Sequence, residues 1–526
     1  MTLKLYKIVL ILSVACVLTT SAQANNLSIT NVGMVSRDPG TKSLVVQFDV
    51  SWDNSWHNKI NHDAVWLTVR LNNIQDTITN KKLCQISASG LNPVGSSLGT
   101  ANNMEFYVPA DKKGAFLRRS SNGNVSNISV QKAQLTINYD SCGFSDTDQV
   151  YVSVFGLEMV FVPQGDFYAG DYDTSTASLD TGSASNNPWH IISENPIPVT
   201  NPTSGGYRYV SNNNPGEYPT GASFNVPITF PKGFGPFYAM KYEITEGQWV
   251  EFVNSLGSAA ARSNRDITDN NHKNSDAVID RNTISCSGTP LVCSTLRPSR
   301  PVSFLSWMDL AAFLDWDALR PMTELEFEKM ARGPILPVQG EYAWGSRDIT
   351  AAANISGTED GTETITDPNA NANFNNTVFT TGDGAPSGIA VSQSGPLREG
   401  IFASTSTNRV TAGASYYGVM DLSGNIKERV VTIGNSAGLV FDGQEGDGLL
   451  TTMTGFEGNA NITNWPGFDS TPGHGVDGAN GSGFRGGSWS DNNNLLRTSD
   501  RSEAALTSTA ATASFGGRGV RTYDGN

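Results

Sequence analysis

Alternating apolar and polar positions dominate the first part of the chain. Four such segments are separated by turn-forming Asn, Gly, Asp and Ser residues, and they span residues 42–52, 64–71, 133–139 and 149–157. A period of two residues places alternate side chains on opposite faces of a strand. The pattern therefore predicts an all-β sandwich domain over residues 25–155.

Helical periodicity stands out later, in three short segments. Each begins with a capping box, in which a Ser or Thr side chain and a side chain three residues on satisfy free N–H groups. The boxes pair Thr245 with Gln248, Ser306 with Asp309, and Thr323 with Glu326. The chain beyond is rich in Gly, Asn and Thr, so we expect residues 156–526 to form an α+β domain with few helices and long loops.

Composition limits the partners of the 526-residue chain. It has 50 acidic and 35 basic residues, for a formal net charge of -15. Proteins that bind nucleic acid usually carry a basic surface, because phosphate neutralisation dominates their affinity. The sequence has no basic stripe, so we expect no nucleic-acid partner.

The first residues predict export. Lys4 and Lys7 precede a short apolar run over residues 8–18, and Ala22-Gln23-Ala24 has the form of a cleavage site. We expect residues 1–24 to be a signal peptide and the mature protein to be secreted, periplasmic or at the cell surface. An alternative is a lipoprotein signal ending at Cys16. No later segment is long and apolar enough to predict a transmembrane helix.

Cysteine usage agrees with an oxidising compartment. Without Cys16, the chain has Cys84, Cys142, Cys286 and Cys293. We expect Cys84 to pair with Cys142 and Cys286 with Cys293, because each pair then stays within one region. A zinc site would need tighter clustering of Cys and His.

Seven motifs together resemble the formylglycine-generating enzyme (sulfatase-modifying factor) family. They occur in order as "MVFVPQGDFYAGD", "YEITEGQWVEFVN", "RPVSFLSWMDLAAFLDW", "LRPMTELEFEKMARG", "YAWG", "YGVMDLSGNIKERV" and "FRGGSWSDNNNLLRTSDR…GGRGVR". The resemblance covers about residues 156–526. It implies a C-type-lectin-like fold with long ordered loops, often with bound calcium.

The chemistry of the family's oxidases is missing from the matching segment. Those enzymes oxidise a sulfatase cysteine to formylglycine with copper held by two cysteines, and thiolates suit copper(I) because both are soft. The corresponding segment, 496–518, contains Ser, Thr and Ala but no cysteine. Copper is therefore not expected. The five histidines are scattered, which also disfavours the non-haem iron chemistry of a second branch of the family.

Five arginines lie within or near that segment: Arg485, Arg497, Arg501, Arg518 and Arg521. We expect them to hold loops through carboxylates and carbonyl groups instead of binding an anion.

Calcium is the cofactor that the family motif "DLSGNIKE" implies. Carboxylates of Asp421 and Glu428 and carbonyl groups of Gly424 and Ile426 match the family's calcium positions, and calcium prefers such oxygen ligands. An alternative is a cation-free loop in which Glu428 pairs with an arginine. A second calcium site is expected either at Asn354 and Asp360 or at Asn373 and Asp383.

Three functions remain open. The first is a secreted or surface protein whose non-catalytic lectin-like domain binds protein or carbohydrate through its loops. The second is a copper-dependent formylglycine-generating oxidase. The third is a structural subunit or adhesin of an extracellular assembly that uses self-association. Fold resemblance alone does not choose among them.

Overall fold

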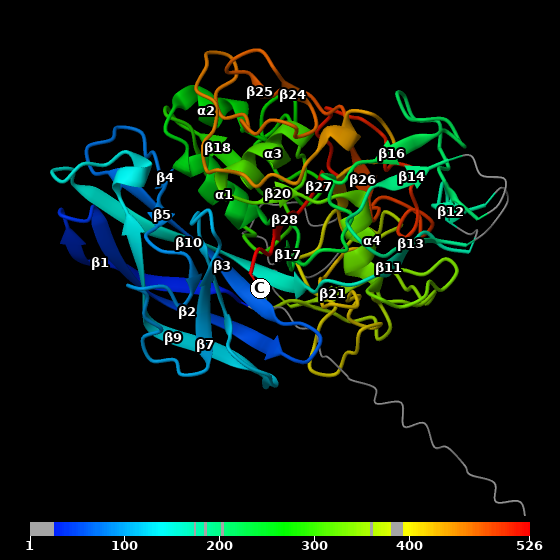
Figure 1. Cartoon of the computed structure of the whole chain (residues 1–526), viewed down its shortest axis with the longest axis horizontal. Helices are drawn as coiled ribbons and strands as arrows, with labels where there is room; N and C mark the ends of the chain where they lie inside the picture. The colour runs from blue at the N-terminus through cyan, green and yellow to red at the C-terminus, as the bar shows by residue number, and fades with distance from the viewer. Residues whose placement is uncertain are drawn as a thin grey trace, which may run out of the picture.

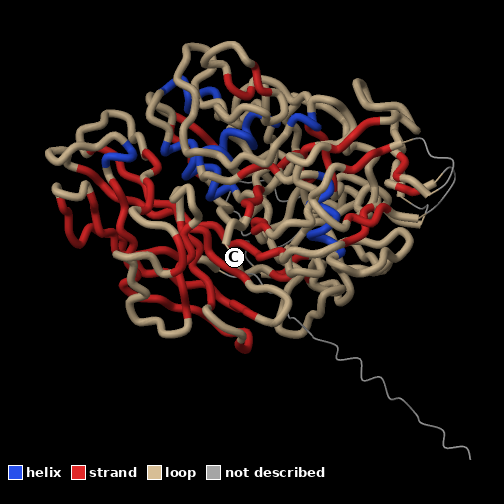
Figure 2. Tube along the Cα trace, in the orientation of Figure 1, coloured by secondary structure: helices blue, strands red, loops and turns tan. Residues whose placement is uncertain are grey.

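The computed structural model describes residues 26–172, 175–182, 187–200, 205–357, 361–379 and 393–525. The expected signal peptide and Cys16 lie outside these residues. Long strands fill the N-terminal part, at the left of Figure 1, and loops with short strands and helices make up the remainder (Figure 2). Few helices and many strands agree with the α+β class.

Two sheets contain the N-terminal strands. The first has the order β1-β2-β9-β5, formed by β1 (Ser28–Asp38), β2 (Ser43–His57), β9 (Gly123–Asn138) and β5 (Gln85–Ile86). The second has nine strands in the order β20-β28-β17-β10-β3-β8-β7-β6, with β4 beside β3. Its strands are β3 (Asp63–Asn73), β4 (Lys82–Leu83), β6 (Gly90–Leu91), β7 (Met104–Val108), β8 (Ala115–Arg119), β10 (Val150–Val162), β17 (Phe237–Met240), β20 (Arg320–Pro321) and β28 (Gly519–Thr522).

Apolar side chains from both sheets form one buried cluster. Val46 and Phe48 of β2, Leu67 and Val69 of β3, and Leu135 of β9 belong to it. Along most of β2, buried residues alternate with partly exposed ones, as the period of two predicts. Burying each such side chain contributes about 1.5–3 kcal/mol, so the alternating segments build the core of the N-terminal part.

Strand β10 joins the two parts of the chain. It pairs with β3 from Val150↔Asn73 to Val160↔Asp63, and with β17 from Met159↔Met240 to Val162↔Phe237. Residue 155, the expected domain boundary, therefore lies inside a continuous strand. The N-terminal strands also contact the end of α3: Arg70 Nη2 donates to the Trp316 carbonyl at 2.6 Å and forms a buried ion pair with Asp317, which directly follows the helix.

Three of the four α-helices in the described residues begin directly after the predicted capping residues. These are α1 (Glu246–Ser255), α3 (Trp307–Trp316) and α4 (Glu324–Arg332), and both hydrogen bonds of each capping box are present. The fourth, α2 (Ala259–Asn264), was not predicted because its six residues carry no apolar stripe. No described helix combines the length and apolar character needed to cross a membrane.

The remaining strands are short and lie between long loops. They form small sheets: β11 (Phe167–Ala169) with β13 (Trp189–Ile191); β12 (Asp180–Thr181), β14 (Ile197–Val199), β15 (Tyr207–Arg208) and β16 (Phe224–Val226); β18 (Ser285–Ser287) with β19 (Val292–Ser294); β21 (Ile355–Ser356) with β22 (Thr364–Ile365); β23 (Lys427–Val431), β26 (Ser482–Arg485) and β27 (Phe515–Gly516); and β24 (Phe468–Asp469) with β25 (Gly475–Val476). Two 3-10 turns span Asp140–Cys142 and Gly438–Val440.

Candidate functional site

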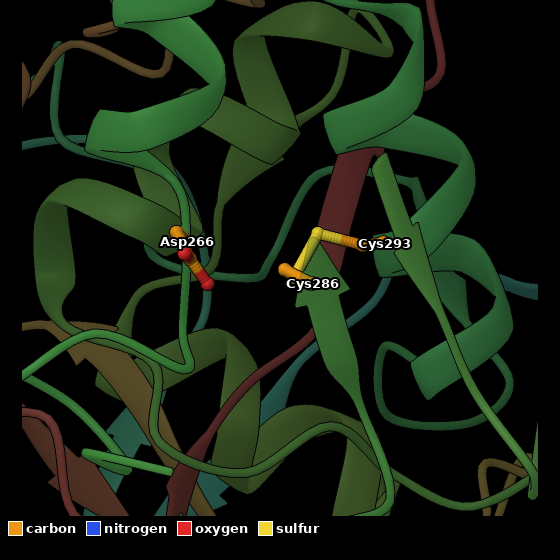
Figure 3. A group of neighbouring side chains, drawn as sticks. All are labelled: Asp266, Cys286 and Cys293. Atoms are coloured by element: carbon orange, nitrogen blue, oxygen red, sulfur yellow. A yellow bond between two sulfur atoms is a disulfide. The ribbon is translucent and has the colours of Figure 1, made fainter. Parts of the chain in front are cut away.

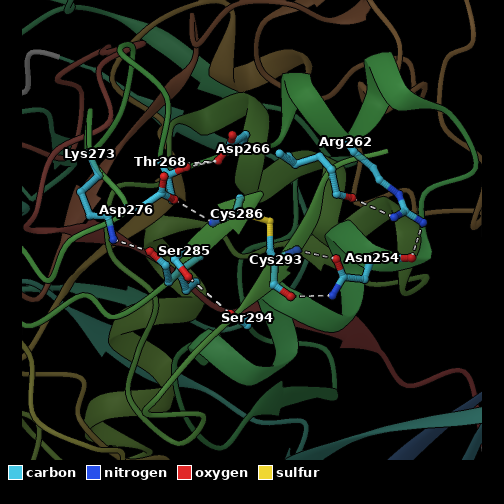
Figure 4. Close-up of a disulfide and its surroundings, with 12 residues drawn as sticks. Asn254, Arg262, Asp266, Thr268, Lys273, Asp276, Ser285, Cys286, Cys293 and Ser294 are labelled. Atoms are coloured by element: carbon cyan, nitrogen blue, oxygen red, sulfur yellow. Dashed lines mark hydrogen bonds between the residues drawn. A yellow bond between two sulfur atoms is a disulfide. The ribbon is translucent and has the colours of Figure 1, made fainter. Parts of the chain in front are cut away.

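Both expected disulfides are present, Cys84–Cys142 and Cys286–Cys293. The second closes the β18–β19 hairpin, which Asn254 of α1 holds through two hydrogen bonds (Figure 4). The Cys293 amide donates to Asn254 Oδ1 at 2.9 Å, and Asn254 Nδ2 donates to the Cys293 carbonyl at 2.9 Å. This disulfide therefore fixes a hairpin against a helix.

Asp266 lies beside the same disulfide, and the three residues form a compact group (Figure 3). The sulfur atoms of Cys286 and Cys293 are bonded to each other, so they provide no thiolate for a metal. All four cysteines in the described part of the chain are in disulfides. Copper chemistry through thiolates therefore has no ligand among them.

The expected calcium loop is a tight turn between buried elements. Gly424 has φ +95°, and a Cβ atom at this position would lie 2.6 Å from the Asn373 carbonyl oxygen. That carbonyl also accepts the Asn425 amide at 2.8 Å. Asp421 is buried, and its Oδ2 accepts the Gly400 amide at 2.8 Å. Only glycine fits at position 424, because the turn needs both a positive φ and a close backbone approach.

Glu428 forms a buried ion pair with Arg518. Both of its carboxylate oxygens accept hydrogen bonds from Arg518, at 2.6 and 2.7 Å, and both side chains are fully buried. The neighbours Lys427 and Arg429 point to other partners: Lys427 pairs with Glu503 at 2.7 Å. Glu428 therefore takes the arginine-paired arrangement that the sequence offered as the alternative to calcium ligation.

Glu243 is a third buried carboxylate at this loop, which the sequence did not single out. Its oxygens accept from Asn425 Nδ2 at 3.1 Å and from the Ile426 amide at 3.2 Å. Burial, reinforced by the charge of Asp421, raises the pKa of Glu243 well above its ordinary value. The clustered negative charge suits a cation, but Glu428 is already neutralised by Arg518. Calcium at this loop would therefore use Asp421 and carbonyl groups such as those of Gly424 and Ile426.

The two alternatives for a second calcium site are only partly described. Asp360 and Asp383 lie outside the described residues. The backbone amide of Asn354 donates to the Asp367 carboxylate at 2.8 Å. Asn373 Nδ2 donates to the Gly395 carbonyl at 3.0 Å. The second site stays a prediction.

A buried network of charges holds the segment that follows β26. Arg501 Nε donates to Glu324 Oε2 at 2.6 Å, and Arg485 Nη2 donates to Glu328 Oε1 at 2.8 Å and to the Thr498 carbonyl at 2.6 Å. Both glutamates belong to α4 and are fully buried. The arginines therefore hold loops to carboxylates and carbonyl groups, as expected.

Arg429 holds the later half of segment 496–518. Its guanidinium donates to the carbonyls of Ser508 at 3.0 Å and Ala510 at 2.7 Å. It also lies over the ring of Phe484, 4.6 Å from the centroid. Segment 496–518 is thus held in part through its own backbone carbonyl groups.

A pocket of about 390 Å³ lies beside this segment. Thr509 and Ala511 line one side, and the other walls are mainly polar. The walls include Asn264, Arg265, Asn271, His272, Ser306, Met308, Asp309, Asn459 and Asp477. The site therefore offers donors and acceptors to a polar ligand.

His272 and Asp309 are charged residues that line the pocket. His272 Nε2 lies 2.8 Å from Asp309 Oδ2, and its Nδ1 lies 2.7 Å from Asp269 Oδ1. Arg265 Nη1 donates to Asp309 Oδ1 at 2.8 Å. Burial alone would lower the pKa of His272, but the two carboxylates outweigh it and raise the pKa to about 9. His272 is therefore an imidazolium at neutral pH.

Sequence reasoning missed this cluster. Asp309 was identified only as a member of the capping box of α3, in which its carboxylate accepts the Ser306 amide. His272 is 37 residues away from it in the chain, so no local spacing linked them. By contrast, Asp469, His474 and Asp477 lie within nine residues, a spacing that could have been noticed.

Comparison with protein families gives one match. The model of the sulfatase-modifying factor enzyme 1-like domain (FGE-sulfatase) matches residues 154–523. A comparison with curated proteins finds no match. The matched region begins in β10 and ends just after β28, so it includes the disulfide hairpin, the expected calcium loop and the pocket. The chain therefore belongs to the sulfatase-modifying factor enzyme 1-like (FGE-sulfatase) family.

Proposed function

We propose that the protein is an exported, non-oxidase member of this family that binds a polar protein or carbohydrate ligand. In this proposal, a C-type-lectin-like domain presents the binding loops and an N-terminal β-sandwich is attached to it. One observation carries the proposal. Segment 496–518 has no thiol at the positions of the family's copper ligands. Its backbone is held where Arg429 donates to the Ala510 carbonyl and where the Arg501 amide donates to the Thr176 carbonyl.

The pocket beside Thr509 and Ala511 is the binding site that we propose. Its walls combine the cationic pair Arg265 and His272 with the carboxylate of Asp477. Such a mixed lining matches hydroxyl, amide and carboxylate groups, which occur on glycans and on polar peptides. Loops on a rigid core commonly carry such binding sites.

Blocking the pocket tests this proposal. Thr509 is exposed, so Thr509→Arg adds bulk at the rim without removing a buried contact. The matched control is Val94→Arg on the N-terminal part, where Val94 is 92% exposed. Glycan arrays and pull-downs from native surface material should give a ligand that binds the wild type and Val94→Arg but is lost in Thr509→Arg. Equal binding by all three proteins would contradict the proposed site.

Self-assembly is a second candidate, supported by an edge strand. Among the described residues, β1 pairs only with β2, and its Met34 and Val35 are 52% and 53% exposed. Free strand edges with apolar side chains can pair with another chain. Concentration-dependent light scattering that Met34→Lys abolishes would support assembly, and a monomer at all concentrations would oppose it.

A further inference from the structure

The β24–β25 hairpin gathers three side chains that can bind a metal. Phe468 pairs with Val476 and Asp469 with Gly475, so the connecting turn is short. The turn is also held locally, because the Thr471 amide donates to Asp469 Oδ1 at 2.8 Å. Asp469 and His474 thus flank one tight turn, and Asp477 follows directly after β25.

One donor atom each from Asp469, His474 and Asp477 lies within 4.8 Å of the others. His474 Nδ1 and Asp469 Oδ2 are 2.7 Å apart. Two donors that bind zinc at about 2.1 Å in a tetrahedral arrangement are separated by about 3.4 Å. The His474–Asp469 distance is shorter than this value, and the Asp477 donor lies within 4.8 Å of both, so the three donors are close enough to share one ion after side-chain adjustment.

The imidazole is held in position from outside the hairpin. The Phe456 ring stacks on His474 with centroids 3.6 Å apart and planes inclined by 16°. Asn459 Nδ2 also donates to the His474 carbonyl at 2.9 Å. Partners that orient a ligand before binding reduce the cost of assembling a metal site.

Charge and exposure both favour a cation here. The carboxylates of Asp469 and Asp477 both lie close to His474, since one donor atom from each of the three residues lies within 4.8 Å of the others. The side chains of His474 and Asp469 are 22% and 38% exposed, so an ion in solution can reach them. A divalent cation would relieve the repulsion between the two carboxylates.

We propose that Asp469, His474 and Asp477 bind a divalent zinc-class ion, with solvent completing the coordination. One nitrogen and two carboxylate donors suit zinc, whereas calcium prefers oxygen donors alone. This site lies on a different hairpin from the calcium loop expected at Asp421. Asp477 also lines the proposed ligand pocket, but zinc binding by these three side chains does not require that pocket to bind a ligand.

A second Asp–His pair provides the control. His190 Nε2 lies 2.8 Å from Asp166 Oδ2, and its ring stacks on Tyr168 with centroids 4.4 Å apart. Within the described residues, no third metal-ligating side chain joins this pair. His190→Ala therefore removes a similar histidine without touching the proposed site.

The test is isothermal titration of the untagged, chelator-stripped mature chain with zinc chloride at pH 7.5. We expect one zinc equivalent in the wild type and His190→Ala, and at least tenfold weaker binding in His474→Ala and in Asp477→Asn. Asp477 is exposed, so Asp477→Asn tests the site even if His474→Ala does not fold. No zinc equivalent in the wild type, unchanged binding in Asp477→Asn, or its loss in His190→Ala would overturn the proposal.

Discussion

Replacing Glu324 with glutamine should strongly destabilise the protein, because this carboxylate lies at the centre of a buried network. Arg501 donates to it at 2.6 and 3.2 Å, and Arg485 at 3.3 Å. Thr432 Oγ1 and the Ile433 amide donate to it at 2.9 and 2.8 Å. The side chains of Glu324, Arg485 and Arg501 are inaccessible to solvent.

Glutamine keeps the size of the side chain but removes its charge, so two buried guanidinium groups lose their shared counterion. Removing one partner of a buried ion pair typically costs about 3–5 kcal/mol. The matched control is Glu251→Gln, which breaks the partly exposed pair with Lys81. Exposed pairs contribute about 1 kcal/mol or less.

Urea unfolding followed by tryptophan fluorescence measures both variants. The effect of Glu324→Gln should also depend on pH. Burial would raise the pKa of Glu324, but Arg501 and Arg485 outweigh it and hold the pKa below its ordinary value of 4.5. The stabilisation is therefore complete above that pH and is lost as the pH falls through the folded-state pKa. A Glu324→Gln loss no larger than that of Glu251→Gln would refute this reasoning.

Three further predictions concern single contacts. The pKa of His272 is raised from 6.5 to about 9, so the stability lost in His272→Gln should be largest below pH 6.5 and shrink as the pH rises through 9, as measured by urea unfolding. Gly424→Ala should lower the free energy of unfolding by about 1–3 kcal/mol more than Gly455→Ala does. Both glycines have a positive φ, but only a Cβ atom at position 424 would meet a carbonyl oxygen. Equal losses in urea unfolding would contradict this. Replacing Cys84 and Cys142 with alanine should cost about 4 kcal/mol by the loop-entropy relation, since they are 58 residues apart; unchanged urea unfolding would contradict it.

Local signals in the sequence predicted local structure well. Thr245, Ser306 and Thr323 cap helices as expected, because a capping box depends on residues only three positions apart. The cysteine pairs were also correct, because few pairings keep each disulfide within one region. The arginines around segment 496–518 were expected to hold loops, and Arg485, Arg501 and Arg518 each do so.

Contacts between distant segments were not predictable in the same way. His272 meets Asp309 across 37 residues, and Glu243 meets Asn425 across 182. Strand β10 continues through the expected boundary because it pairs with β3 and β17 at once. Hydrophobic periodicity predicts which face of a strand is buried, but it does not predict which strands lie beside it in the sheet.

We propose that this family member lacks oxidase chemistry, and a peptide-oxidation assay examines that proposal. The purified mature chain is loaded with copper(I) and incubated aerobically with a cysteine-containing sulfatase peptide, and peptide aldehyde is measured by mass spectrometry. We predict no aldehyde above the protein-free control, because segment 496–518 offers no thiolate. Copper-dependent formation of formylglycine at multiple turnovers would contradict the account.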